Sequence, residues 1–182
     1  MTEPEDSSLV SSCLKGNAGA FEILVERYQR QIFNAALRMV KDYDDARDLT
    51  QTAFVKAYER LESFDPRHKF FSWIYRIVIN EAINFLKWRR QHEALNSGIA
   101  EATERPDVDI ENGERTEMVQ EAIYQLRVEQ RVLIVLRHFA ELSYRELAYV
   151  LEVPEKTVKS RLYAARQALC VLLEEKGVTA SD

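Results

Sequence analysis

The sequence predicts an all-α chain built from two small helical domains. Glycine and proline are scarce, at 5 and 4 of 182 residues. Residues that favour helices, such as Leu, Ala, Glu, Arg and Gln, are abundant. Apolar residues recur every three or four positions through most of the chain, which is the period of an amphipathic helix.

A short acidic segment divides the chain. Residues 94–117 carry seven acids and two bases, a net charge of −5 that equals the formal net charge of the whole protein. The segment is poor in large apolar residues, so it cannot bury enough surface to offset the entropy cost of ordering. We therefore expect a first domain at 8–93, a flexible acidic linker at 94–117 and a second domain at 118–177.

Composition and spacing argue against several functional classes. An apolar run of about 18 residues is missing, so we expect no membrane insertion, and the acidic start is unlike a secretory signal. Cys13 and Cys170 are isolated, and no histidine is spaced near a cysteine as a metal site requires. We expect a reduced cytoplasm and no metal. Without a phosphate loop or nucleophile motif, we expect no enzyme and no cofactor.

The first domain shows helical periodicity throughout. Residues 18–40 carry an apolar stripe that begins at Phe21. An aspartate at 42–45 can cap the next helix, which extends to Leu61. Pro66 then opposes continuation, and a long aromatic helix follows at 70–91.

The second domain is predicted to hold helices near 116–126 and 129–139, then the pair in "LSYRELAYVLEVPEKTVKSRLYAARQAL". In this pair Ala148 allows two helices to approach closely, and Val153 fills the turn. Such a layout is typical of a helix-turn-helix whose second helix enters the DNA major groove. Thr157 and the helix N-terminus suit a phosphate. An αα-hairpin with a solvated basic face remains open; the face comprises Lys156, Lys159, Ser160, Tyr163 and Arg166.

The aromatic helix carries a polar stripe, Ser72, Arg76, Asn80, Asn84 and Lys87. Arginine and asparagine can read base edges, and aromatic rings stack on unpaired bases. We expect most of the aromatic residues to be core, and the sequence leaves Trp73 and Trp88 between core and base stacking. Asn80 lies among apolar residues and needs a partner, either internal or a ligand.

The helix at 42–61 has a mixed-charge outer face. Its exposed positions include Asp45, Arg47, Asp48 and Gln51. From periodicity alone this face either docks a partner or meets solvent.

Four motifs in this order resemble a known family. They are "AFEILVERYQRQIFNAALRMV", "DARDLTQTAFVKAYERLESF", "FFSWIYRIVINEAINFLKWRR" and the helix-turn-helix pair. Together they closely resemble the extracytoplasmic-function, or group-four, sigma factors of the sigma-70 family. The resemblance covers nearly the whole chain outside the linker and the termini.

The resemblance implies a role for each surface. The first domain would be region two, which docks on core RNA polymerase through Asp45, Asp48, Leu49, Gln51 and Phe54. Its aromatic helix would open and read the minus-ten element, with a flipped base held by the loop "SFDPRHKF", through Lys69, Trp73, Arg76, Asn80, Asn84 and Lys87. The second domain would be region four, which reads the minus-thirty-five duplex through Lys156, Thr157, Lys159, Ser160, Tyr163 and Arg166.

The same resemblance implies partners. These are core RNA polymerase, promoter DNA as duplex and single strand, and an anti-sigma factor, in a stress or envelope response. The acidic linker would thread through polymerase channels that hold nucleic acid. Two other interpretations remain: a stand-alone helix-turn-helix regulator that dimerises through the first domain, and an interaction protein whose aromatic helix is wholly core.

The sequence departs from the family pattern at informative positions. Arg47 and Thr52 stand where the family commonly has acids, and phosphorylation of Thr50 or Thr52 would restore negative charge. Glu152 stands where the helix-turn-helix commonly has glycine. This substitution costs about 1 kcal/mol if the φ angle there is positive.

Overall fold

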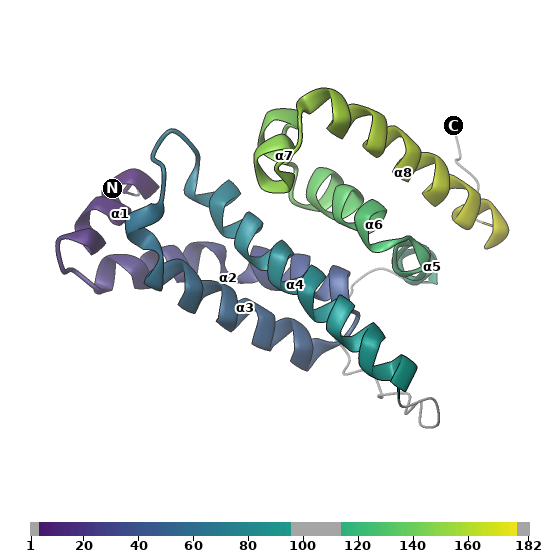
Figure 1. Cartoon of the computed structure of the whole chain (residues 1–182), viewed down its shortest axis with the longest axis horizontal. Coiled ribbons are helices and arrows are strands. Elements are labelled where there is room, and N and C mark those ends of the chain that lie inside the picture. Colours follow the sequence, from purple (N-terminus) through teal and green to yellow (C-terminus); the bar gives the residue numbers. More distant parts are fainter. Residues whose placement is uncertain (1–3, 96–113, 178–182) are drawn as a thin grey trace.

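The computed structural model describes residues 4–95 and 114–177. Within these ranges the chain forms helices and no strand, which confirms the all-α prediction (Figure 1). The predicted linker lies mostly at 96–113, outside the described residues. The helices are α1 (Asp6–Leu14), α2 (Gly19–Val40), α3 (Tyr43–Glu59), α4 (Phe70–Leu95), α5 (Glu114–Gln125), α6 (Val128–Ile134), α7 (Tyr144–Leu151) and α8 (Glu155–Glu175), with a 3-10 turn at Leu61–Ser63 and a π-helical turn at Val135–Phe139.

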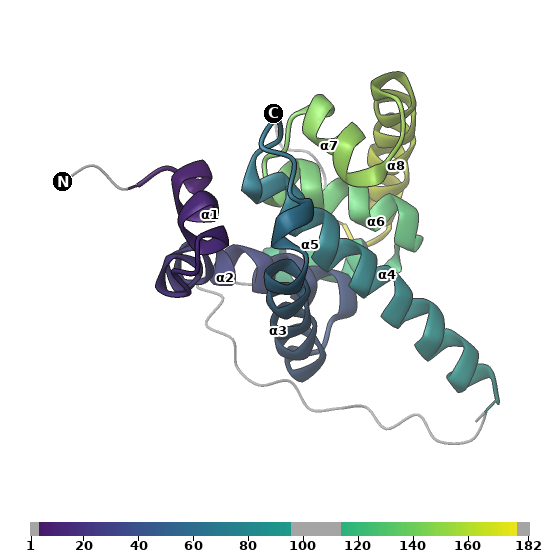
Figure 2. The same ribbon diagram turned by 60° about the vertical axis from the view of Figure 1, so that its left-hand side comes forward.

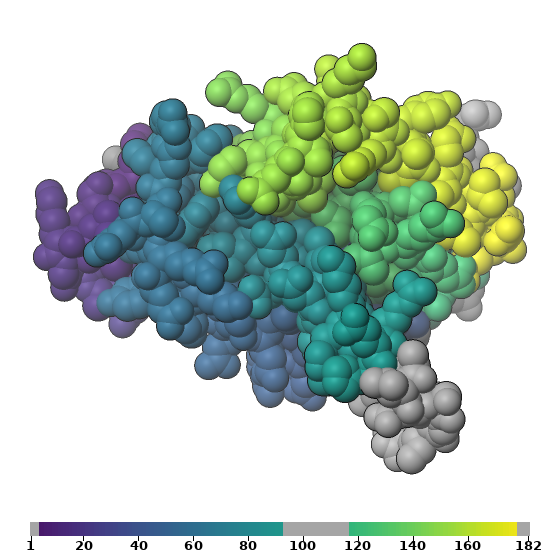
Figure 3. All heavy atoms as spheres, in the orientation of Figure 1, coloured from purple at the N-terminus to yellow at the C-terminus, as the bar shows by residue number. Residues whose placement is uncertain are grey.

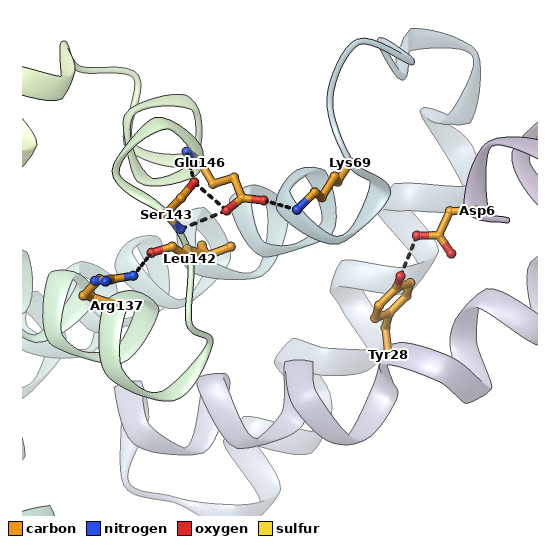
Figure 4. A network of polar contacts seen from close by, with 7 residues as sticks. All are labelled: Asp6, Tyr28, Lys69, Arg137, Leu142, Ser143 and Glu146. Carbon is orange, nitrogen blue, oxygen red and sulfur yellow. Dashed lines mark hydrogen bonds and ion pairs between the residues drawn. The ribbon is translucent and has the colours of Figure 1, made fainter.

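Helix α1 was not predicted from the sequence. It is short and serine-rich, and it buries only Leu9 and Val10. Tertiary contacts hold it in place: the Asp6 carboxylate accepts a hydrogen bond from the Tyr28 hydroxyl at 2.5 Å (Figure 4), and a second from Arg27 at 2.5 Å. An isolated helix of this length is marginal in water, so packing against α2 rather than propensity explains its presence.

The first block of the structure consists of α1 to α4, and helices α2, α3 and α4 form its core. Their buried faces carry the apolar residues that the 3.6-residue period indicated, including Leu24, Ile32 and Ile74. The predicted cap of α3 is present, because the Asp42 side chain accepts a hydrogen bond from the amide of Asp45 at 2.9 Å. Helix α2 ends at Lys41, whose φ of 68° is left-handed.

The second block consists of α5 to α8. Helix α7 begins with a capping box, in which the Ser143 hydroxyl and the Glu146 carboxylate each satisfy a backbone amide. It ends at Glu152, whose φ of 54° and ψ of 41° are left-handed. Glycine, which the family commonly has at this position, adopts these angles without steric cost. Val158, Leu162 and Ala165 then anchor α8 against the block's core.

The two blocks pack against each other, with α7 beside α4 and the α5–α6 end beside α2 (Figures 1 and 2). In the space-filling view, atoms of the second block lie directly against those of α4 (Figure 3). Two domains on a linker were predicted, but their contact was not.

One part of this interface lies at the C-terminal end of α2. The Tyr124 hydroxyl donates to the carbonyl of Leu37 at 3.1 Å, and the Arg131 guanidinium donates to that of Met39 at 2.5 Å. Lys41 forms an ion pair with Glu121 at 2.7 Å. Carbonyls at a helix C-terminus carry partial negative charge, and most of them lack an intrahelical partner, so they favour donors and cations at this end.

Candidate nucleic-acid interface

The first candidate surface is the outer face of α8. Three of the predicted side chains, Lys156, Lys159 and Ser160, are exposed, and Thr157 is half-buried near the helix N-terminus. The Tyr163 side chain is 67% exposed, which is unusual for an aromatic residue. The opposite stripe of α8 is buried, so the fold presents this face to a ligand as a rigid helical row.

Arg166, the remaining predicted residue on α8, is half-buried. Its Nε donates to His138 Nε2 at 3.2 Å. Burial and the nearby guanidinium groups of Arg166 and Arg137 lower the pKa of His138, which keeps the imidazole neutral and able to accept. The contact holds Arg166 at the edge of the basic face. A DNA phosphate that approaches Arg166 there has to displace only a neutral acceptor, His138.

The second candidate surface is the polar side of α4. Asn80, Asn84 and Lys87 are exposed on it. Asn80 therefore does not need an internal partner, and of the two possibilities that the sequence left open, the structure favours a side chain available to a ligand. Trp88 is also exposed, at 54%.

Trp73 does not lie on this surface, which corrects its prediction as a base-reading residue. Its side chain is 7% exposed. The ring packs on Phe64 and Phe70, with centroid separations of 5.4 and 5.7 Å. Trp73 is a core residue that holds the loop against the start of α4.

The loop before α4 is organised by Asp65. Its carboxylate accepts hydrogen bonds from the backbone and guanidinium of Arg67, and its carbonyl accepts one from the amide of His68 at 3.0 Å. The Arg67 side chain lowers the pKa of Asp65 to about 2. This turn presents Lys69, the first predicted minus-ten residue, at the N-terminus of α4.

Two predicted minus-ten residues form ion pairs with the second block, although the Lys69 side chain remains 75% exposed. Lys69 forms an ion pair with Glu146 of α7 at 2.9 Å (Figure 4). Arg76 forms an ion pair with Glu152. Burial raises the pKa of the Glu146 carboxyl, but hydrogen bonds from Ser143 and the nearby ammonium of Lys69 lower it by more. As a result, the pKa of Glu146 lies below its usual value. The carboxylate therefore stays charged.

A third surface, an apolar groove between α2 and α3, was missed in the sequence. It has a volume of about 750 Å³. Val55 and Tyr58, each 50% exposed, are part of its wall. Exposed apolar positions at the i and i+3 positions of one helix were the signal that could have indicated it. The lining also includes Phe21, Val25, Phe33, Arg47, Thr50, Gln51 and Phe54.

The predicted docking residues fall in different places. Gln51 and Phe54 line the groove, and Asp48 is exposed beside it. Asp45 is half-buried and lies 3.4 Å from Arg89 of α4. Leu49 is 8% exposed, which corrects its prediction as a docking side chain, because it packs inward.

Comparisons with known proteins agree with this geometry. Residues 24–92 match the family model "Sigma-70 region 2", and residues 116–169 match "Sigma-70, region 4". The RNA polymerase sigma-H factor of Pseudomonas aeruginosa is 36% identical, with 93% of this chain and 94% of that protein covered. The chain belongs to the extracytoplasmic-function (ECF) RNA polymerase sigma factors.

Other ECF relatives and solved structures support the assignment. The ECF sigma-E factor of Escherichia coli K12 is 35% identical, with 90% of this chain and 92% of that protein covered. The structure of CnrH in complex with the cytosolic domain of CnrY is similar, with a TM-score of 0.73 and 28% identity over 93% of this chain and 97% of that chain. Both region matches in one chain support the sigma-factor interpretation over a stand-alone helix-turn-helix regulator.

Within 4–95 and 114–177, no group of three or more His, Cys, Asp or Glu residues is placed to hold a metal ion. None of the described helices is long and apolar enough to cross a membrane. As an ECF sigma factor, the protein binds core RNA polymerase and directs promoter-specific transcription initiation.

Proposed function

We propose that this ECF sigma factor divides its work among the three surfaces described. The outer face of α8 reads the minus-thirty-five duplex, the polar face of α4 with its preceding loop reads the opened minus-ten element, and the α2–α3 groove docks core polymerase. The observation that carries this assignment is the exposed row on α8, Lys156, Lys159, Ser160 and Tyr163, on a helix whose other side is fully anchored.

The α8 row has the chemistry of duplex recognition. Lysine ammonium groups neutralise phosphates, which supplies much of the affinity. Ser160 and Tyr163 offer hydroxyls that donate to or accept from base edges or phosphates. The first turn of α8 adds the positive end of the helix dipole, which favours a phosphate near Thr157.

The α4 face suits single-stranded DNA. Asn80 and Asn84 can hydrogen-bond bases, and Lys87 lies farther along for the backbone. Lys69 and Arg76 complete the set once their contacts with α7 are released. Trp73 acts from the core by fixing the loop.

The groove supports docking of core polymerase through apolar contact, with Gln51 and Phe54 in its lining. Arg47 lines it where the family commonly has an acid. Phosphorylation of Thr50 or Thr52 stays a prediction. Thr52 is exposed, whereas the Thr50 hydroxyl donates to the Ala46 carbonyl at 2.7 Å, so Thr52 is the better placed of the two. Full activity of a Thr52→Ala variant in cells would count against it.

We further propose that the protein acts in the cytoplasm and is restrained by an anti-sigma factor. The solved structure of CnrH holds the cytosolic domain of CnrY. A second similar structure, at a TM-score of 0.73 and 23% identity, is of the sigma factor RpoE in complex with the anti-sigma factor NepR from Bartonella quintana. An envelope or stress response is the corresponding setting.

In vitro transcription on a genomic promoter library, with core polymerase, tests the proposal. The wild-type protein is expected to produce transcripts whose promoters share two motifs at fixed spacing. Lys159→Ala and Asn80→Ala are each expected to reduce these transcripts about tenfold, because each removes one base or phosphate contact. Lys15→Ala, an exposed lysine on the first block, should leave them unchanged. Equal transcription by all the variants would refute the assigned surfaces.

A further inference from the structure

Helix α7 covers the part of α4 and its preceding loop that is proposed to read the minus-ten element. Ion pairs and a ring stack join them. Glu146 pairs with Lys69 at 2.9 Å, and Glu152 pairs with Arg76. Between these two ion pairs, the Tyr149 ring stacks on His68 with a centroid separation of 3.8 Å and an interplanar angle of 18°.

These contacts reproduce the chemistry of a bound single strand. Nucleic acid offers anionic phosphates to cations and flat bases to aromatic rings. Helix α7 and the residue that caps its C-terminus, Glu152, offer two carboxylates to the same cations, and Tyr149 offers one flat ring to an imidazole. Glu146 and Tyr149 are three residues apart and lie on one side of the helix. Glu152 has a left-handed backbone and reaches Arg76 from the turn that follows the helix.

Glu152 strengthens this interpretation because its position is unfavourable for any residue with a Cβ atom. Its left-handed φ of 54° is one that glycine adopts without steric cost. A glycine would serve the turn better, but it has no side chain to pair with Arg76 as the Glu152 carboxylate does. The Arg76 guanidinium also lies over the Tyr149 ring, 5.4 Å from its centroid, so one cation joins both parts of the contact.

We infer that α7 is an internal mimic of single-stranded promoter DNA, and that His68 is the residue on which an unpaired promoter base stacks. The inference rests on the proposed minus-ten role of α4. In the free protein α7 occupies the loop end of the reading surface, at His68, Lys69 and Arg76, and it must leave before a single strand can bind there. The apparent affinity for single-stranded DNA is then the intrinsic affinity reduced by the fraction of molecules that are open.

The first test measures binding of a dye-labelled, random-sequence single-stranded oligonucleotide pool to the free full-length protein by fluorescence anisotropy. Glu152→Gln, which removes the ion pair, is expected to bind about three- to tenfold more tightly than the wild type. Glu22→Gln is the matched control, since it removes the same charge from an exposed position on α2, away from both DNA-reading surfaces. Its affinity should change by less than about twofold. Equal affinities for Glu152→Gln and Glu22→Gln would overturn the mimicry.

Stacking on His68 is tested in the open background. Adding His68→Ala to Glu152→Gln is expected to weaken oligonucleotide binding by about fivefold or more, as loss of one base–aromatic stack predicts. If His68→Ala has no effect there, His68 is not the stacking residue.

The second test measures directly whether α7 lies on α4, by energy transfer between two dyes. One dye is on Cys170 of α8 and the other on a cysteine introduced as Glu62→Cys, and Cys13→Ser removes the remaining cysteine. Adding the oligonucleotide to the wild type should lower transfer, because DNA displaces α7. Arg76→Glu should also lower it, and Arg76→Glu with Glu152→Arg should restore it. Oligonucleotide binding by the wild type without loss of transfer would show that α7 does not compete.

These outcomes are separable from those of the proposed function. A protein that supports transcription with core polymerase, yet shows no effect of Glu152→Gln on either readout, would keep its sigma role and lose the mimicry. A protein that opens on DNA addition but supports no transcription would retain the contact and contradict the promoter assignment.

Discussion

Val55→Asp is expected to weaken the binding of core RNA polymerase by about 30-fold or more. Val55 is 50% exposed and forms part of the wall of the α2–α3 groove. An aspartate there places a charge in an apolar contact that loses its water on binding. Loss of a central contact of this kind costs about 2 kcal/mol or more of binding free energy. Competition binding of purified core polymerase to the labelled protein measures the change.

Leu14→Asp provides a matched control for this result. Leu14 is also 50% exposed and lies in the first block, at the end of α1. The chemical change is the same, but the residue lies outside the groove. We expect near wild-type polymerase binding, with circular dichroism showing both variants folded. Equal losses in the two variants would mean that the groove is not the docking surface.

Trp73→Ala is expected to lower the free energy of unfolding by about 3–5 kcal/mol, the usual cost of removing a large buried aromatic side chain. The reason is the cluster with Phe64 and Phe70, which fixes the loop at the start of α4. Urea unfolding followed by far-ultraviolet circular dichroism measures the change.

Trp88→Ala is the control for the tryptophan prediction, because Trp88 is 54% exposed on the same helix. We expect a loss of stability below about 1 kcal/mol there. A stable Trp73→Ala protein that fails only in promoter opening would instead restore the base-stacking role that the sequence left open.

Much of the fold could be predicted because it depends on local pattern. The apolar period placed α2, α3 and α4 close to their observed limits, and Asp42 marked the start of α3. The helix-turn-helix was recognisable because small and apolar residues must recur at its turn. Helix α1 escaped prediction because distant partners, Arg27 and Tyr28, hold it.

The candidate surfaces were predicted unevenly. A basic row on one helix face can be counted from sequence, so the α8 surface was found. An apolar groove between two helices depends on how α2 and α3 pack, and periodicity along one helix does not reveal it. The same limit explains the error at Leu49, because neighbours on other helices decide whether its side chain is buried. At Trp73 the loop residue Phe64 packs on the ring together with Phe70, and helical periodicity does not place a loop residue.

The sequence by itself determined the helices, the two blocks, the family and the basic face of α8, since each follows from residue types at fixed local spacing. Only the tertiary structure decided that α7 lies on α4, that Glu146 and Glu152 pair with Lys69 and Arg76, and that Trp73 is core. The physical reason is range: helical periodicity is local, whereas contacts between residues some 75 positions apart depend on how two separately predictable blocks meet.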